Sequence, residues 1–147
     1  MTITWSDWRE ITKPAVYKEC AVYRIRLCSY GGPVRINRFL GVDEDGLLCI
    51  GKTTRMEYRR KQFVIGLSGR FAHSEGNLLH ILETVSPLLK TYSESKYQYS
   101  FAKVRAGQES KIEEELIKSY VRRFGEVPPL NSAIPDRYGY WQIDAQP

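Results

Sequence analysis

Two features of the chain bring together residue types that can do chemistry on a polyanion. Between positions 52 and 70, six cationic side chains are interrupted by one acid, and the cations are Lys52, Arg55, Arg59, Arg60, Lys61 and Arg70. The second feature is Glu113, which lies on the apolar side of a predicted helix. Dense cations bind phosphates, and a carboxylate that faces a core needs a cation, a metal ion, hydrogen-bond donors or a water-filled cleft.

Composition sets limits on these interpretations. The 147 residues carry a net charge of +5, with a pI of about 9.1, which favours a polyanionic partner such as nucleic acid. On composition alone, a solvated helix face explains the basic segment equally well. Three cysteines without a Cys-x-x-Cys pair and only two histidines give no zinc pattern. No apolar run approaches the roughly 18 to 20 residues of a membrane span, and the N-terminus lacks a secretory pattern, so we expect a cytoplasmic protein.

The first third of the chain predicts antiparallel strands. Alternating residues from Ala21 to Leu27 indicate a half-buried strand, and Val34 to Leu40 a shorter one. A turn at positions 43–46 precedes the apolar run from Leu47 to Ile50, and Tyr97 to Phe101 alternates as a returning strand.

Three helices are expected around these strands. Arg55 to Phe63 predicts a short basic helix ended by Gly66 and Gly69, and Asn77 to Leu89 a core helix kinked at Pro87. From Ser110 to Phe124 the apolar spacing predicts an amphipathic helix closed by Gly125. Its phase puts Glu113 in the middle of the apolar stripe, Glu114 at the edge and Glu115 outside. We therefore predict one α/β (α+β) domain over residues 1–147, with a small, mainly antiparallel three-stranded sheet flanked by helices.

The order of several short motifs resembles that of the GIY-YIG nuclease family, over about residues 21–131. Ala21-Val22-Tyr23 is similar to the first motif, and Cys49-Ile50-Gly51-Lys52 to the second. Arg59 follows Gly51 by eight positions, Glu113 begins a Glu-x-x-Leu-Ile pattern, and Asn131 closes the set. The long connection between the first two motifs resembles an extended bacterial and phage subset.

The resemblance implies a metal-dependent DNA endonuclease that leaves a 5′ phosphate. It implies that Tyr23 assists the attacking water, that Arg59 and Lys52 hold the phosphate, and that Glu113 binds one Mg²⁺ or Mn²⁺. Asn131 would brace the site or simply form a turn. The proposed DNA contacts are Arg55, Arg60, Lys61, Arg70 and His73, with His73 alternatively capping a loop. A homodimer or a protein partner would allow both strands to be cut.

Cys49 departs from the family pattern, because it stands where the second-motif tyrosine is expected. A thiolate at Cys49 could replace that tyrosine as a base, whereas a small buried side chain is the commoner role of a free cysteine. The departure keeps open a nucleic-acid-binding or partner-binding protein with this fold and weak or lost catalysis. A further alternative, an RNA-binding domain unrelated to the family, would explain the basic helix but not Glu113 in the apolar stripe.

Overall fold

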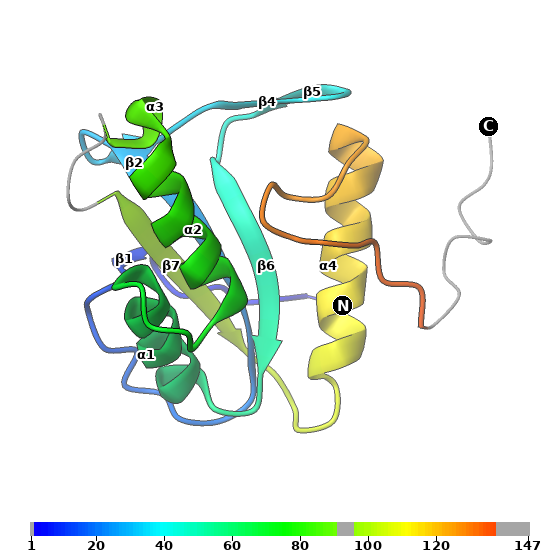
Figure 1. Cartoon of the computed structure of the whole chain (residues 1–147). Coiled ribbons are helices and arrows are strands. Elements are labelled where there is room, and N and C mark those ends of the chain that lie inside the picture. Colours follow the sequence, from blue (N-terminus) through cyan, green and yellow to red (C-terminus); the bar gives the residue numbers. More distant parts are fainter. Residues whose placement is uncertain (1, 91–95, 138–147) are drawn as a thin grey trace.

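The computed structural model describes residues 2–90 and 96–137 and shows an α+β fold built on an antiparallel sheet (Figure 1). The elements in chain order are β1 (Arg9–Glu10), β2 (Ala21–Ser29), β3 (Gly32–Pro33), β4 (Ile36–Arg38), β5 (Gly41–Asp43), β6 (Leu47–Thr53), α1 (Met56–Leu67), α2 (Ser74–Val85), α3 (Pro87–Lys90), β7 (Tyr97–Lys103) and α4 (Glu109–Phe124). In the described part of the chain, no helix is long and apolar enough to cross a membrane.

Strand β2 is the centre of the sheet. It pairs with β7 on one side and with β6 on the other, while β1 extends the sheet beyond β7 and the short β3 pairs with the end of β2. Every pairing is antiparallel. Strand β6 therefore forms one edge of the sheet, and the candidate site lies around this edge.

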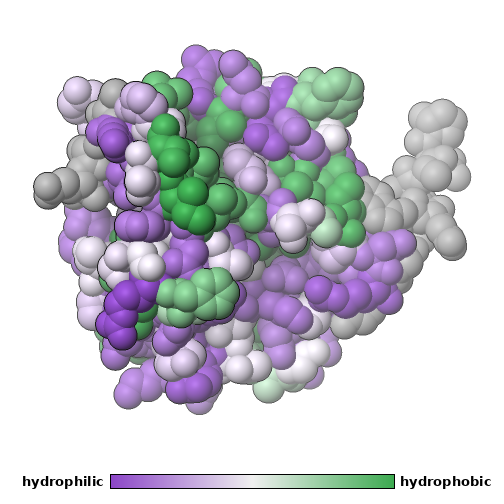
Figure 2. Space-filling model, in the orientation of Figure 1, coloured by the Kyte–Doolittle hydropathy of each residue, from purple (hydrophilic) through white to green (hydrophobic). Residues whose placement is uncertain are grey.

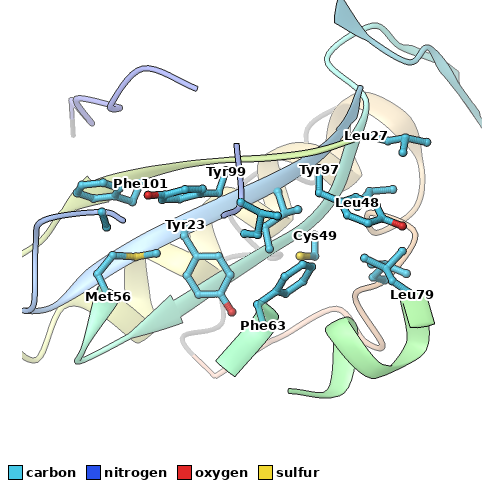
Figure 3. Packing of buried hydrophobic residues seen from close by; sticks show 14 of the residues in the cluster. Tyr23, Leu27, Leu48, Cys49, Met56, Phe63, Leu79, Tyr97, Tyr99 and Phe101 are labelled. Carbon is cyan, nitrogen blue, oxygen red and sulfur yellow. The ribbon is translucent and has the colours of Figure 1, made fainter. Parts of the chain in front are cut away.

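Helices cover both faces of the sheet (Figure 1). On one face, Met56, Phe63 and Leu79 of α1 and α2 pack with buried residues of the strands (Figure 3). On the other face, α4 contributes Ile112, Ile117, Tyr120 and Phe124 to two smaller apolar clusters. Successive side chains of a strand point to opposite faces of the sheet, so one strand contributes to the core on both faces.

Strands β2 and β7 and helix α4 confirm the sequence predictions, including the left-handed Gly125 that ends α4 with a φ of 77°. Of the segment predicted as a strand from Val34 to Leu40, only β4 forms, and β5 follows beyond its end. Strands β4 and β5 form a separate hairpin, whose connection docks on the end of α4 through the Leu40 amide and the Phe124 carbonyl, 2.9 Å apart.

Two predictions about α1 and α2 were wrong. Gly66 does not end α1 but lies within it, where α1 crosses α2. Glycine is suited to this crossing, since a Cβ there would come within 3.1 Å of the Gly76 backbone. The predicted core helix, α2, buries only Gly76 and Leu79, and Ile81 is 55% exposed. Figure 2 shows apolar side chains gathered on the outer surface over α2.

Candidate active site

Tyr23 is held against Gly51 by the pairing of β2 with β6. The two residues are direct partners in the register, and a Cβ on residue 51 would overlap the Tyr23 ring. The Ile-Gly-Lys stretch of the second motif, within β6, therefore has a steric reason to contain glycine. The missing side chain leaves room for the tyrosine ring beside the edge strand.

The Tyr23 hydroxyl lies at one end of a chain of polar contacts. Arg59 Nε donates to the hydroxyl oxygen at 3.2 Å, and His73 Nε2 lies 3.3 Å from that oxygen. The two neighbours of His73 Nδ1 make opposite demands: the Gly76 amide donates towards it at 3.4 Å, whereas Oε2 of Glu75, at 3.0 Å, can only accept. The shorter contact, to a carboxylate, assigns the proton to Nδ1 at the expense of the longer one and leaves Nε2 to accept from Tyr23.

The charges of this chain of contacts are set by burial and hydrogen bonding. Burial and the neighbouring Cys49 raise the pKa of Tyr23, and the opposing effect of Arg59 does not offset them. Burial also acts to raise the pKa of Glu75, but hydrogen bonds from His73 and Ser74 outweigh it and lower that pKa to about 2. Tyr23 is therefore a neutral phenol at neutral pH, and Glu75 is a carboxylate.

Lys52 was expected to hold the phosphate together with Arg59. The structure places it on the other side of the sheet from the Tyr23 hydroxyl: Lys52 pairs with Val22 on the α4 side, where its ammonium contacts the Ser110 hydroxyl. His73 was expected among the DNA contacts, but it is buried at the start of α2. Glu75 was not predicted as a site residue, although it belongs to the His73-Ser74-Glu75-Gly76 stretch, which resembles a short motif of the same family subset.

Cys49 packs in the core on the same face of the sheet as Tyr23 and Phe63 (Figure 3). Its side chain is 2% exposed, and burial raises the pKa of the thiol. A protonated thiol is a poor base, so burial argues against Cys49 taking a proton from water. We therefore assign Cys49 a packing role rather than a catalytic one.

Glu113 lines a cleft of about 230 Å³ together with Glu75, Asn131 and Arg137. Its side chain is 13% exposed, and its Oε1 lies 3.8 Å from Nη1 of Arg137. Burial raises the pKa of Glu113, while Lys52 and Arg137 act in the opposite direction. Glu75 belongs to α2 and Glu113 to α4, and these helices cover opposite faces of the sheet. Both glutamates line the same cleft because it lies at the edge formed by β6.

The expected burial of the α4 glutamates was wrong, although the apolar residues of the helix lie on the predicted face. Glu114 is the buried carboxylate, lying 3.5 Å from the Lys118 ammonium and accepting a 2.6 Å hydrogen bond from the Arg137 amide. Lys118 also pairs with Asp136 at 2.9 Å. The segment around Asp136 covers this side of α4. The buried face of α4 is therefore wider than its apolar stripe, and Glu113 faces the cleft.

Asn131 braces the edge strand. Its Oδ1 accepts from the Ile50 amide at 3.0 Å, and its Nδ2 donates to the Ile50 carbonyl at 2.9 Å. The side-chain amide thus bonds β6 as a neighbouring strand would. This agrees with a bracing role and leaves its amide no free polar atom for a metal ion.

The basic helix α1 divides its cations between two environments. Arg60 is 7% exposed, makes a two-point pair with Glu57 at 2.6 and 2.9 Å, and donates to the Ile11 carbonyl at 2.8 Å. It is a structural residue, which corrects its prediction as a DNA contact. Arg55, Lys61 and Arg70 are exposed, and Arg55 stacks on Tyr58 at 3.9 Å from the ring centroid.

A scan against protein-family models and searches of curated proteins and solved structures found no match. The GIY-YIG likeness stays a prediction from the motifs.

The residues at the cleft fit a hard divalent cation with oxygen ligands. Mg²⁺ is held in proteins by one or two carboxylates, with waters and substrate phosphates completing its coordination. Glu113 and Glu75 supply two carboxylates to one cleft. The described residues contain no cluster of three or more His, Cys, Asp or Glu side chains suited to a metal, so waters and substrate phosphates would supply the remaining ligands. A cation there would also offset the burial that raises the pKa of Glu113.

Proposed function

We propose that this protein is a metal-dependent DNA endonuclease that hydrolyses phosphodiester bonds by a one-metal mechanism of the GIY-YIG type. The observation that carries the proposal is the Glu75–His73–Tyr23–Arg59 chain of contacts, whose Glu75 end lines the same cleft as Glu113, while His73, Tyr23 and Arg59 line a small neighbouring pocket. Together with Glu113, this chain of contacts supplies the three roles that phosphodiester hydrolysis requires. These are a proton acceptor at Tyr23 and His73, a phosphate-binding cation at Arg59 and a metal-binding carboxylate at Glu113.

Proton transfer from the attacking water runs through Tyr23 in this mechanism. The phenol oxygen takes a proton from water while its own proton passes to Nε2 of His73, so a high tyrosine pKa is no obstacle. The Glu75 carboxylate stabilises the imidazolium that forms, as an acid–histidine pair does in hydrolases. The negative charge of Glu75 stabilises protonated His73 by direct contact. Because Glu75 also faces the cleft, the same charge attracts a cation bound at Glu113 from further away.

Arg59 and Glu113 act on the phosphate. Arg59 is half-buried and uses Nε for Tyr23, which leaves its terminal nitrogens to bind phosphate oxygens. Glu113, with Glu75 nearby, would hold Mg²⁺ or Mn²⁺, which when bound supplies positive charge to the departing oxygen. The exposed cations Arg55, Lys61 and Arg70 extend the phosphate-binding surface.

The test is nicking of supercoiled DNA in Mg²⁺ by the purified protein and by Tyr23→Phe, His73→Ala, Arg59→Ala and Glu113→Ala. We expect each variant to lose at least about 100-fold in rate, since proton transfer or charge stabilisation of this kind contributes roughly 10²–10⁴-fold. Lys90→Ala, an exposed α3 cation, is the control. Unchanged nicking in Glu113→Ala would remove the metal site from the proposal.

A second candidate is a DNA-binding protein with this fold and little catalysis, which the buried, protonated Cys49 favours. Replacing Cys49 by tyrosine is a poor test, because a ring does not fit a filled core. DNA binding by wild type without nicking in either Mg²⁺ or Mn²⁺, together with loss of binding in Lys61→Glu, would support this candidate.

A further inference from the structure

A second, larger hollow lies at the opposite edge of the sheet from the cleft. Its volume is about 740 Å³, within the range of roughly 300–1,000 Å³ that is usual for small-molecule sites. The N-terminal segment, the end of β7 and residues 15–17 form its walls. The Ser6 amide donates to the Phe101 carbonyl at 2.8 Å, which holds the N-terminal wall against β7.

The charge of this hollow has one sign. Its lining includes Arg9, Lys103 and Arg105 and no Asp or Glu. None of the three makes an ion pair with a residue that the structure describes, although Arg9 donates to the Pro14 and Ala15 carbonyls at 3.3 and 3.2 Å. Three unpaired cations around one concavity concentrate an anion there.

Aromatic rings form the apolar part of the lining. Tyr17 and Phe101 are stacked, with ring centroids 5.6 Å apart and an interplanar angle of 11°. The Lys103 ammonium lies 4.9 Å from the Tyr17 centroid. Trp5 also belongs to the lining, and the Arg24 guanidinium stacks on its ring at 4.2 Å from the centroid. Rings beside cations suit a ligand that has both a flat apolar part and an anionic part.

The rim of the hollow is held in a strained conformation. Val16 has a φ of 59° and is 87% exposed, a costly backbone geometry for a β-branched residue. Glu57 fixes it from both sides, since its Oε1 accepts from the Ala15 amide at 2.9 Å and its own amide donates to the Tyr17 carbonyl at 3.0 Å. The start of α1 thus holds the hollow in shape before any ligand binds.

We propose that this hollow binds a nucleotide, with the phosphate at Lys103 and Arg105 and the base against the aromatic wall. The site is separate from the cleft and does not depend on the nuclease function. The nucleotide is either free or the end of a DNA strand, because both present the same base and phosphate.

Calorimetric titration of the full chain with deoxyadenosine monophosphate tests the proposal. We expect binding that weakens at least about tenfold for deoxyadenosine and for inorganic phosphate, because each lacks one half of the ligand. The exposed pair Lys103→Glu with Arg105→Glu should weaken it by a similar factor. Lys90→Glu and Arg59→Ala, at the Tyr23 hydroxyl, should leave it unchanged.

A second measurement separates this site from the cleft and identifies the source of the nucleotide. Quenching of tryptophan fluorescence should accompany binding, and Trp5→Leu should remove the ligand-dependent part. Tighter binding of a short single-stranded oligonucleotide than of the mononucleotide assigns the site to a strand end, and the reverse assigns it to a free nucleotide. No binding at millimolar concentration, or binding lost in Arg59→Ala but kept in the double variant, would overturn the proposal.

Discussion

The contact between Tyr23 and Gly51 connects the two short motifs physically. The ring occupies the space that a side chain at position 51 would need, so the tyrosine hydroxyl is aimed at Arg59 and His73 by the backbone of the neighbouring strand. Sequence order predicted that these residues belong together. It did not predict the steric reason, because cross-strand register is not visible in one sequence.

Gly51→Ala should displace the Tyr23 ring. We expect a loss of nicking of at least about 100-fold and a lower melting temperature, because the added methyl must push a buried side chain aside. Gly32→Ala is a matched control, since a Cβ there meets nothing within 4 Å. Equal activity of both variants in the nicking assay would show that the ring position is not important.

Glu113→Gln should raise the stability of the metal-free protein at neutral pH. Burial raises the pKa of Glu113 in the folded state, so its contribution to stability is full below the ordinary carboxylate pKa and is lost as pH rises through the folded value. The neutral amide removes this penalty. Thermal melts with and without Mg²⁺ check the prediction: wild type gains stability from the ion, and the variant does not.

Among the secondary-structure elements, hydrophobic spacing correctly predicted β2, β7 and α4. It failed to predict which residues are buried where the packing partner is distant in the sequence. The apolar residues of α2 do not all face inward, because α2 rests mainly on α1 and only one line of side chains reaches the sheet. Glu114 escaped prediction for a related reason. Its burial depends on Lys118 and on the distant segment near Asp136.

Substitutions in α2 should differ sharply by face. Leu79→Ala should cost about 2–4 kcal/mol of unfolding free energy, because it leaves a cavity beside Phe63 and Cys49. Ile81→Ala should change it by less than about 0.5 kcal/mol, as is usual for exposed positions. Urea unfolding measures both, and similar values would mean that α2 packs through a different face.

Adjacent cations in α1 should separate stability from DNA binding. Arg60→Ala should destabilise the fold by about 3 kcal/mol, because it leaves Glu57 unpaired in a poorly solvated position. Lys61→Ala should leave stability unchanged and weaken DNA binding, with a smaller salt dependence. Denaturant melts and fluorescence anisotropy at several salt concentrations distinguish the two effects.

For the molecule as a whole, two buried or half-buried carboxylates link stability to acid. Hydrogen bonds from Arg60 lower the pKa of Glu57 to about 2, despite burial, and Glu75 reaches a similar value. Glu57 accepts from the amide of Ala15, 42 residues earlier in the chain, a contact that composition cannot reveal. The net charge predicted a polyanionic partner, but it could not predict that unpaired cations would gather around a second hollow on another edge of the sheet.

Stability should therefore fall as pH drops from about 5 towards 2. A lowered folded pKa stabilises the protein above the unfolded value and is lost as pH falls through the folded one. Glu57→Gln should reduce stability at pH 7 and flatten its dependence on acid. Melting temperatures across this range check the sign, and an unchanged slope in the variant would contradict it.

Asn131 also has a consequence for solubility. An edge strand presents unpaired amides and carbonyls that invite another chain to add to the sheet. On β6, the Asn131 side chain occupies both polar groups of Ile50, and the Leu130 amide donates to the Leu48 carbonyl at 2.8 Å. The edge that borders the cleft is thereby protected from intermolecular β-pairing, so the protein can keep an open groove there without a tendency to aggregate through it.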